Sequence, residues 1–201
     1  GPMAMILAWG QTQYWRPEMI VAPQEKRRAY RKSGWWGDQT LADLFFANAQ
    51  RHPDRPALVD APNRADFAFG EPQRLNYARL QGEVERYAGA LLASGIGKDD
   101  VIIIQLPNIS EFVALYFAAA AIGAIVSPVA VQYRSHELST MFPIVEPKAF
   151  ICGTRMKGAD HLGTVRPFLG DATTLMTVGP DAPADAIDLS CAPSRPELLA
   201  A

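Results

Sequence analysis

The turn Gly95-Ile96-Gly97-Lys98 is the segment of this sequence that comes nearest to a phosphate-binding loop. Such a loop cradles phosphate with backbone N–H groups at the start of a helix, whose N-terminal end attracts anions. Here Leu92 stands where the first glycine of that motif belongs, and Asp99 replaces the Ser or Thr that should follow the lysine. A β-branched run follows instead of a helical pattern, so we interpret the segment as a structural turn.

Histidine, cysteine and paired acidic side chains could transfer protons, attack electrophiles or bind metals. The candidates of these types are His52, His136, His161, Cys152, Cys191 and the pair Asp99-Asp100. No histidine has a partner at the spacing of a metal site or a catalytic triad, and neither cysteine lies in a CxxC motif. The acidic pair is interpreted as a solvated turn. We therefore expect no catalytic residue and no metal ligand in this chain.

The segment Val129–Arg134 is the remaining candidate for a binding site. It follows a short apolar run that we interpret as a strand, and ligands of open parallel sheets bind beyond the carboxyl ends of the strands. A plain connecting loop would show the same pattern, so its position alone leaves both interpretations open.

The elements that position this loop belong to one long apolar segment, residues 101–129. Val101–Leu106 is a β-branched run that predicts a strand. Ser110 is expected to cap the following helix, with an acidic residue in the first turn, and Gly123 to end it. Ala124–Val129 predicts a second strand. Two strands joined by a helix form a right-handed parallel βαβ unit, and their lack of polar alternation indicates a sheet covered on both faces.

Similar patterns predict the remaining elements of the chain. Helices are expected after the capping box of Thr40 and Asp43, after the caps Asn76 and Ser135, and over about Ala159–Leu169, and strands at Ala57–Asp60, Ala65–Phe69, Lys148–Cys152 and Thr174–Val178. From Gly97 onward the order is β-α-β-α-β-α-β. This order predicts an α/β fold with an open, mostly parallel, doubly wound sheet and helices on both faces.

Composition narrows the class of protein. The chain has 201 residues, 49% of them apolar, and a net charge of −2, which gives no global field favouring nucleic acid. Phe112–Val131 carries no charge and is long enough to cross a bilayer, but Gly123 and Pro128 divide it into a helix-sized and a strand-sized piece. We therefore expect a buried core, no transmembrane segment and, because no signal peptide is visible, a cytoplasmic protein.

The chain divides into three regions. Residues 1–33 read as an N-terminal arm, in which Gly1-Pro2 before Met3 resembles the remnant of a removed tag. Its basic run Lys26–Lys32 would suit a phosphorylated ligand or a lipid surface, although the pattern favours a solvated helix face. Residues 34–178 form the α/β region, and residues 179–201, rich in Pro, Ala, Asp and Ser, read as a linker or disordered tail.

Three segments carry a family resemblance. Leu75–Leu80 is similar to the first core motif, L-[TS]-Y-x-E-L, of the acyl-adenylate-forming (AMP-dependent synthetase/ligase) superfamily, although Asn76 and Arg79 depart from it. Residues 108–128 resemble the second motif, an alanine-rich helix that runs into a Gly-Ala turn, a strand and a proline. Residues 35–59 resemble the family's opening. The resemblance covers about 34–178, and its details are nearest to medium-chain or alicyclic acid–CoA ligases.

The resemblance implies a two-step reaction with ATP, Mg²⁺ and coenzyme A. A carboxylate attacks the α-phosphate of ATP to give an acyl-adenylate and pyrophosphate, and the thiol of coenzyme A then displaces AMP. The family's Ser/Thr/Gly-rich phosphate loop, its Tyr-Gly-x-Thr-Glu stretch and its mobile C-terminal domain do not occur in this sequence. We therefore expect the N-terminal subdomain of an acid–CoA ligase, inactive alone and with no cofactor bound. The resemblance also places Val131, Gln132 and Tyr133 near the coenzyme A channel and allows for a homodimer.

Two other classes of function remain open from the sequence. One is a stand-alone α/β module that binds a nucleotide or another small ligand, which micromolar binding in calorimetry would favour. The other is a non-catalytic interaction domain that uses exposed apolar surface, which concentration-dependent association without ligand binding would favour.

Overall fold

The computed structural model describes residues 22–157, 160–195 and 197. The chain separates into two compact units, residues 1–39 and residues 40–201, and each is described by itself.

The first unit contains one described helix, α2 (Gln24–Lys32), which holds the basic run. None of its residues is buried. The centroid of the Tyr30 ring lies 5.6 Å from the ring centroid of Trp35 and 5.1 Å from that of Trp36. Arg31 forms an exposed ion pair with Asp38. The helix surface is therefore open to solvent within this unit. Residues 1–21 of the arm lie outside the described residues.

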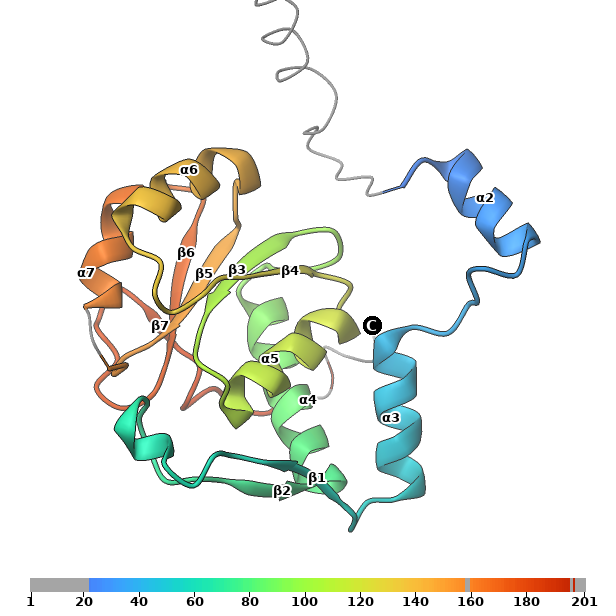
Figure 1. Cartoon of the computed structure of the whole chain (residues 1–201), viewed down its shortest axis with the longest axis horizontal. Coiled ribbons are helices and arrows are strands. Elements are labelled where there is room, and N and C mark those ends of the chain that lie inside the picture. The colour runs from blue at the N-terminus through green and yellow to red at the C-terminus, as the bar shows by residue number, and fades with distance from the viewer. Residues whose placement is uncertain (1–21, 158–159, 196, 198–201) are drawn as a thin grey trace, which may run out of the picture. The chain divides into compact units, whose positions relative to one another are not determined.

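The second unit is an α/β sandwich around a parallel sheet (Figure 1). Its helices are α3 (Leu41–Arg51), α4 (Tyr77–Ala93), α5 (Ser110–Ala121), α6 (Ser135–Val145) and α7 (His161–Val165), with 3-10 turns η1 (Arg64–Asp66) and η2 (Arg166–Phe168). Its strands are β1 (Pro56–Val59), β2 (Arg74–Asn76), β3 (Val101–Gln105), β4 (Ile125–Pro128), β5 (Ala149–Gly153), β6 (Thr174–Val178) and β7 (Ile187–Asp188). The main sheet has the order β4-β3-β5-β6-β7 with every pair parallel, so the predicted fold class is confirmed.

Alternate residues of the central strands supply two separate cores. Ile102 and Ile104 of β3 pack with α3, α4 and α5, whereas Ile103 packs on the opposite face with α6 and α7. In β5, Ile151 joins the first core and Phe150 the second. Because successive strand residues point to opposite faces, an unbroken apolar strand requires cover on both sides, and the helices provide it.

Local signals set most helix ends as expected. Thr40 and Asp43 form a reciprocal capping box at the start of α3, and the Asn76 side chain accepts a hydrogen bond from the N–H of Arg79 at the start of α4. Gly95 and Gly123 follow α4 and α5 with φ of +77° and +74°, a backbone conformation that favours glycine after a helix.

Three local predictions are wrong. Ser135 does not cap α6, because it is the first residue of that helix and the N-cap residue is Arg134. Ala65–Phe69 is not a strand: the residues around Arg64 form η1 because its side chain turns inward to buried partners, and β1 pairs antiparallel with β2 instead. Ser110 does not cap α5, because the N-cap residue is Ile109 and no local side chain caps the helix. Its hydroxyl takes part in the same buried network.

The C-terminal region is also more ordered than its composition predicts. The expectation of a linker or disorder is wrong at β7, which pairs parallel with β6, and at Leu189, which is fully buried in the first core. Arg86 of α4 donates a hydrogen bond to the Leu189 carbonyl. The strand pairing of Ile187 and Asp188 and the burial of Leu189 therefore anchor a segment that is otherwise polar and proline-rich.

Among the helices that the structure describes, none combines the length and the apolar character needed to cross a bilayer.

Candidate functional site

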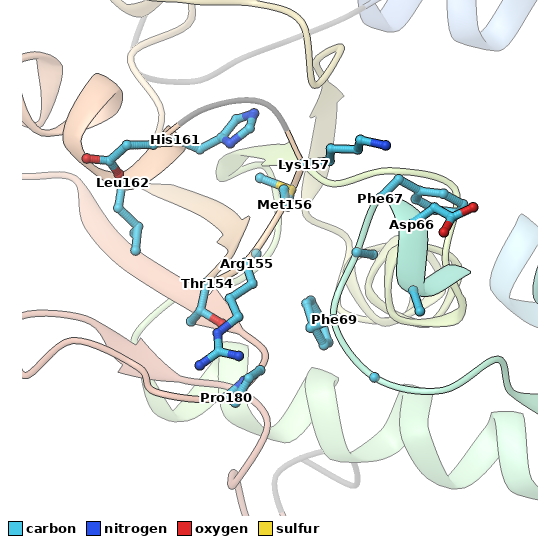
Figure 2. A pocket seen from close by; sticks show the side chains of 15 residues that line it. Asp66, Phe67, Phe69, Thr154, Arg155, Met156, Lys157, His161, Leu162 and Pro180 are labelled. Carbon is cyan, nitrogen blue, oxygen red and sulfur yellow. The ribbon is translucent and has the colours of Figure 1, made fainter. Parts of the chain in front are cut away.

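A cavity of about 550 Å³ lies at the carboxyl edge of the sheet, the edge at which ligands of such sheets bind, but its lining includes no residue of the predicted loop Val129–Arg134. Its walls are the segment 65–70 between β1 and β2, the segment 153–157 that continues β5, the start of α7, and Pro180 after β6. Figure 2 shows Asp66, Phe67 and Phe69 on one side of the cavity and His161 and Leu162 on the other.

His161 connects this cavity to the predicted loop. Its ring is buried, and Nε2 lies 2.8 Å from the carbonyl oxygen of Val131. The side chain therefore joins α7 to the loop after β4. The other two histidines, His52 and His136, are exposed.

The loop after β4 is held by two further side chains. Nε2 of Gln105, the last residue of β3, donates to the carbonyls of Ala130 and Tyr133 at 3.0 and 3.1 Å. Nη1 of Arg134 donates to the carbonyls of Val131 and Tyr133 at 2.6 and 2.8 Å. The loop is therefore fixed by its backbone carbonyls, which leaves its side chains available to a ligand.

The predicted site residues differ in exposure. Val131 is half-buried, whereas Gln132 and Tyr133 are exposed, Tyr133 with 38% of its surface accessible. Their placement beside a coenzyme A channel stays a prediction.

Charged side chains of both signs surround the cavity. Arg155 forms an exposed ion pair with Asp181 at 2.5 Å, and Asp160 accepts a hydrogen bond from the N–H of Gly163 in the first turn of α7. Lys157 is exposed at the rim. The hydroxyl of Thr154 is buried with no hydrogen-bond partner among the described residues. The rim of the cavity thus presents the exposed cations Arg155 and Lys157 to an anionic ligand.

Neither a reactive cysteine thiolate nor a metal cluster is found at this edge among the described residues. Cys152 lies in β5, where burial raises the pKa of its thiol to about 12, so it stays protonated at neutral pH. Groups of three or more His, Cys, Asp or Glu side chains that could bind a metal ion are absent from this part of the chain.

A buried ionic network stands behind the cavity wall, and sequence reasoning missed it. Arg64, with 1% of its surface exposed, donates from Nη1 to Asp60 Oδ2 at 2.5 Å and from Nη2 to Glu111 Oε1 at 2.7 Å. It also donates from Nη1 to the Ser110 hydroxyl and from Nε to the Phe69 carbonyl. Desolvation acts to lower the pKa of Arg64, but the hydrogen bonds and charges of Glu111 and Asp60 outweigh it and raise the pKa.

A second cavity, of about 810 Å³, lies on the other side of the same wall. It is bounded by α4, the first turn of α5 and the segment after β6. Phe69 and Gly70 line both cavities. The segment 65–70 therefore separates two hollows at one edge of the sheet.

The sequence profile of the AMP-binding enzyme family matches residues 45–196. This chain belongs to the AMP-binding enzyme family. The predicted resemblance to adenylate-forming ligases is therefore confirmed, and it extends through the C-terminal segment that contains β7.

Individual relatives agree with the family assignment. Pyochelin synthase PchD of Pseudomonas aeruginosa (strain UCBPP-PA14) is 34% identical over 153 residues, which are 75% of this chain and 26% of that protein. The medium-chain fatty-acid–CoA ligase of Escherichia coli (strain K12) is 31% identical over 155 residues, 77% of this chain and 26% of the ligase. The solved acetoacetyl-CoA synthetase from Streptomyces lividans is 26% identical with a TM-score of 0.66, covering 78% of this chain and 26% of that structure. The chain thus spans about a quarter of the length of these proteins.

Proposed function

We propose that this chain is the N-terminal subdomain, residues 34–178 with the sheet extension β7, of an ATP-dependent carboxylic acid–CoA ligase. The enzyme forms an acyl-adenylate and then an acyl-CoA thioester. The family assignment and the similarity to two proteins named for acyl-CoA or acid–CoA chemistry support this class of activity.

One hydrogen-bond contact supports the role in coenzyme A binding that we propose for this chain. The contact between His161 Nε2 and the Val131 carbonyl joins the loop Val131–Tyr133 to a side chain that lines the cavity bordered by Arg155 and Lys157. Coenzyme A carries several phosphates, and exposed guanidinium and ammonium groups are suitable partners for them. In the proposed enzyme the exposed side chains of Gln132 and Tyr133 orient the thiol arm, and Arg155 and Lys157 hold the nucleotide end.

The residues of this chain do not fit the ATP and Mg²⁺ sites of the proposed reaction. The turn at Gly95–Lys98 precedes β3 at the amino edge of the sheet, opposite to the cavity, and it opens no helix. We assign ATP, Mg²⁺ and the catalytic groups to the remainder of the enzyme, and we derive no magnesium step from this chain. The substrate is a carboxylic acid of medium-chain or alicyclic type, and the enzyme acts in the cytoplasm.

The proposal is tested by comparing the protein encoded by the whole reading frame with this 201-residue chain. With ATP, Mg²⁺, coenzyme A and a panel of carboxylic acids, the whole protein should release pyrophosphate and form an acyl-CoA, and the chain alone should release none above background. Sustained turnover by the chain alone would refute its assigned role, and a whole protein without coenzyme A-dependent turnover would refute the ligase assignment.

A variant pair tests the cation-lined cavity. Lys157→Ala removes an exposed charge at the cavity rim, so the KM for coenzyme A should rise about fivefold while pyrophosphate release in the first step is unchanged. Lys98→Ala removes a lysine that is paired with Asp99 at the amino edge of the sheet and should leave both unchanged. Equal effects of the two variants would argue against a coenzyme A site here.

A second candidate is an adenylating enzyme that passes its acyl group to an acceptor other than coenzyme A. The 34% identity to a protein named pyochelin synthase favours this reading. Adenylate formation by the whole protein without thioester formation on coenzyme A would select this candidate.

A further inference from the structure

The side chain of Phe69 forms part of the partition between the two cavities. Its ring lies against the backbone at the carboxyl ends of β5 and β6, where both residues are glycine. A Cβ atom at Gly153 would come within 3.3 Å of the ring, and one at Gly179 within 2.9 Å. Because neither glycine has a side chain, the Phe69 ring fits against the backbone at both positions. The position of the ring then depends on the contacts that hold residues 65–70 in place.

The guanidinium group of Arg64 holds this segment, together with the N–H of Lys157, which donates to the Phe67 carbonyl, and a bridge between Ala68 and Met156. Nε of Arg64 donates to the Phe69 carbonyl at 2.9 Å, and the charged carbon lies 5.3 Å from the centre of the Phe69 ring. The other two nitrogens of the same group reach Asp60, Ser110 and Glu111, at distances of 2.5 to 3.1 Å. The wall is thus tied to the first turn of α5 through one planar group.

Lysine could not reproduce this arrangement. A guanidinium presents donors in a fixed plane, so it can bind a carbonyl on one edge and two carboxylates on the others, whereas an ammonium offers one point of attachment. Arg64 and Asp60 are buried, and both carboxylates need a compensating charge. A lysine would satisfy the carboxylates first and release the Phe69 carbonyl.

We propose that Arg64 is a positioning residue that sets the partition between the two cavities by holding Phe69 and its segment 65–70. The inference deepens the proposed function, since it rests on that function for the identity of the ligand in the first cavity. The position of the wall itself does not depend on the ligand.

Hydrogen exchange of the 201-residue chain tests the structural part. The N–H groups of Asp66, Phe67 and Ala68 donate to backbone carbonyls in and beside η1, so they report directly on the wall. Arg64→Lys should speed their exchange about tenfold or more while the amides of β5 and β6 stay protected. Arg74→Lys, the same change at an exposed position on β2, should alter none of them.

Two results would overturn the proposal: unchanged exchange in residues 66–68, or an increase spread equally over the whole sheet. If Arg64→Lys does not fold, hydrogen exchange of Glu111→Gln tests the proposal instead. This variant keeps the ion pair of Arg64 with Asp60 and weakens the interaction of the guanidinium with residue 111. That variant should speed exchange in the wall more than in β3.

Steady-state kinetics of the whole protein test the functional part. Arg64→Lys should raise the KM for coenzyme A at least fivefold and change kcat less than twofold, because the residue shapes a binding wall and touches no reacting atom. A loss in kcat with KM unchanged would contradict the positioning role. A wild-type protein that makes no acyl-CoA would refute the proposed function, and the exchange experiment would still decide the role of Arg64.

Discussion

Asp60 caps α5 from 50 residues away: its Oδ1 accepts the backbone N–H of Ser110 at 2.8 Å. Its Oδ2 accepts from Arg64 and from the N–H of Gln73. One carboxylate therefore satisfies a helix N-terminus, compensates a buried cation and fixes the start of β2. A negative charge at this end of the helix is also favoured by the helix dipole.

Replacing Asp60 with Asn should destabilise the chain strongly. The substitution keeps the size of the side chain but leaves Arg64 with only the partly exposed Glu111, and breaking a buried pair in this way costs about 3 kcal/mol or more. Urea unfolding should show the loss as a lower midpoint with an unchanged slope. Asp54→Asn, in an exposed turn, serves as the control and should change the free energy of unfolding by less than about 0.5 kcal/mol.

The two cysteines should differ in reactivity. Cys152 is buried and its pKa is raised to about 12, whereas Cys191 is exposed at the second cavity. A thiol reagent at pH 8 should therefore modify one cysteine per folded chain, and none in Cys191→Ser. Rapid modification of two cysteines per wild-type chain would contradict the buried position of Cys152.

The raised pKa of Cys152 also predicts a pH dependence of stability. The unfolded thiol loses its proton near pH 9, whereas the folded thiol keeps its proton up to about pH 12. Between these values the unfolded state binds fewer protons, so the contribution of Cys152 to stability is complete below pH 9 and is lost as the pH rises. The stability difference between the wild type and Cys152→Ala should therefore shrink from pH 9 upward in urea unfolding.

The sheet could be predicted from sequence because its information is local. Val101–Gln105 is apolar without alternation, which requires two covered faces, and the glycines after α4 and α5 mark the helix ends. The buried network could not be predicted, because Arg64 finds Ser110 and Glu111 at sequence separations of 46 and 47 residues. An arginine in a turn gives no sign of burial until the partners across the fold are known. Leu189 was missed for the same reason, since its polar and proline-rich neighbours conceal a single core residue.

The loop of the candidate site was also predictable only in part. Its place after β4 was predicted from strand order, but two of the three side chains that fix it come from other elements, β3 and α7, and the third is Arg134 at its own end. Gln105, Arg134 and His161 hold it through backbone carbonyls, which no residue pattern in Val131–Tyr133 can reveal.

Replacing Gln105 with Leu should loosen this loop without unfolding the protein. The amide oxygen of Gln105 is buried with no partner among the described residues, so leucine removes one unsatisfied acceptor while it releases the carbonyls of Ala130 and Tyr133. These effects oppose each other, and the free energy of unfolding should change by less than about 1.5 kcal/mol. Hydrogen exchange should rise for the N–H of Tyr133, which donates to Ala130, and stay constant in β3. Loss of protection throughout β3 would show that Gln105 supports the sheet rather than the loop.

Glycine at the end of β6 should be more sensitive to substitution than a glycine that only ends a helix. Gly179 has φ of +114°, and a Cβ there would lie 2.5 Å from the Thr154 hydroxyl and 2.9 Å from Phe69. Gly95 has φ of +77° and no atom within 4 Å of a built Cβ. Gly95→Ala should therefore cost about 1 kcal/mol from backbone strain alone, whereas Gly179→Ala adds overpacking and should cost about 3 kcal/mol in urea unfolding. Gly179→Ala should also displace Phe69, so exchange at residues 66–68 should rise in this variant and not in Gly95→Ala. Equal losses of stability in the two variants would mean that the Phe69 ring can move aside freely and does not form a fixed partition.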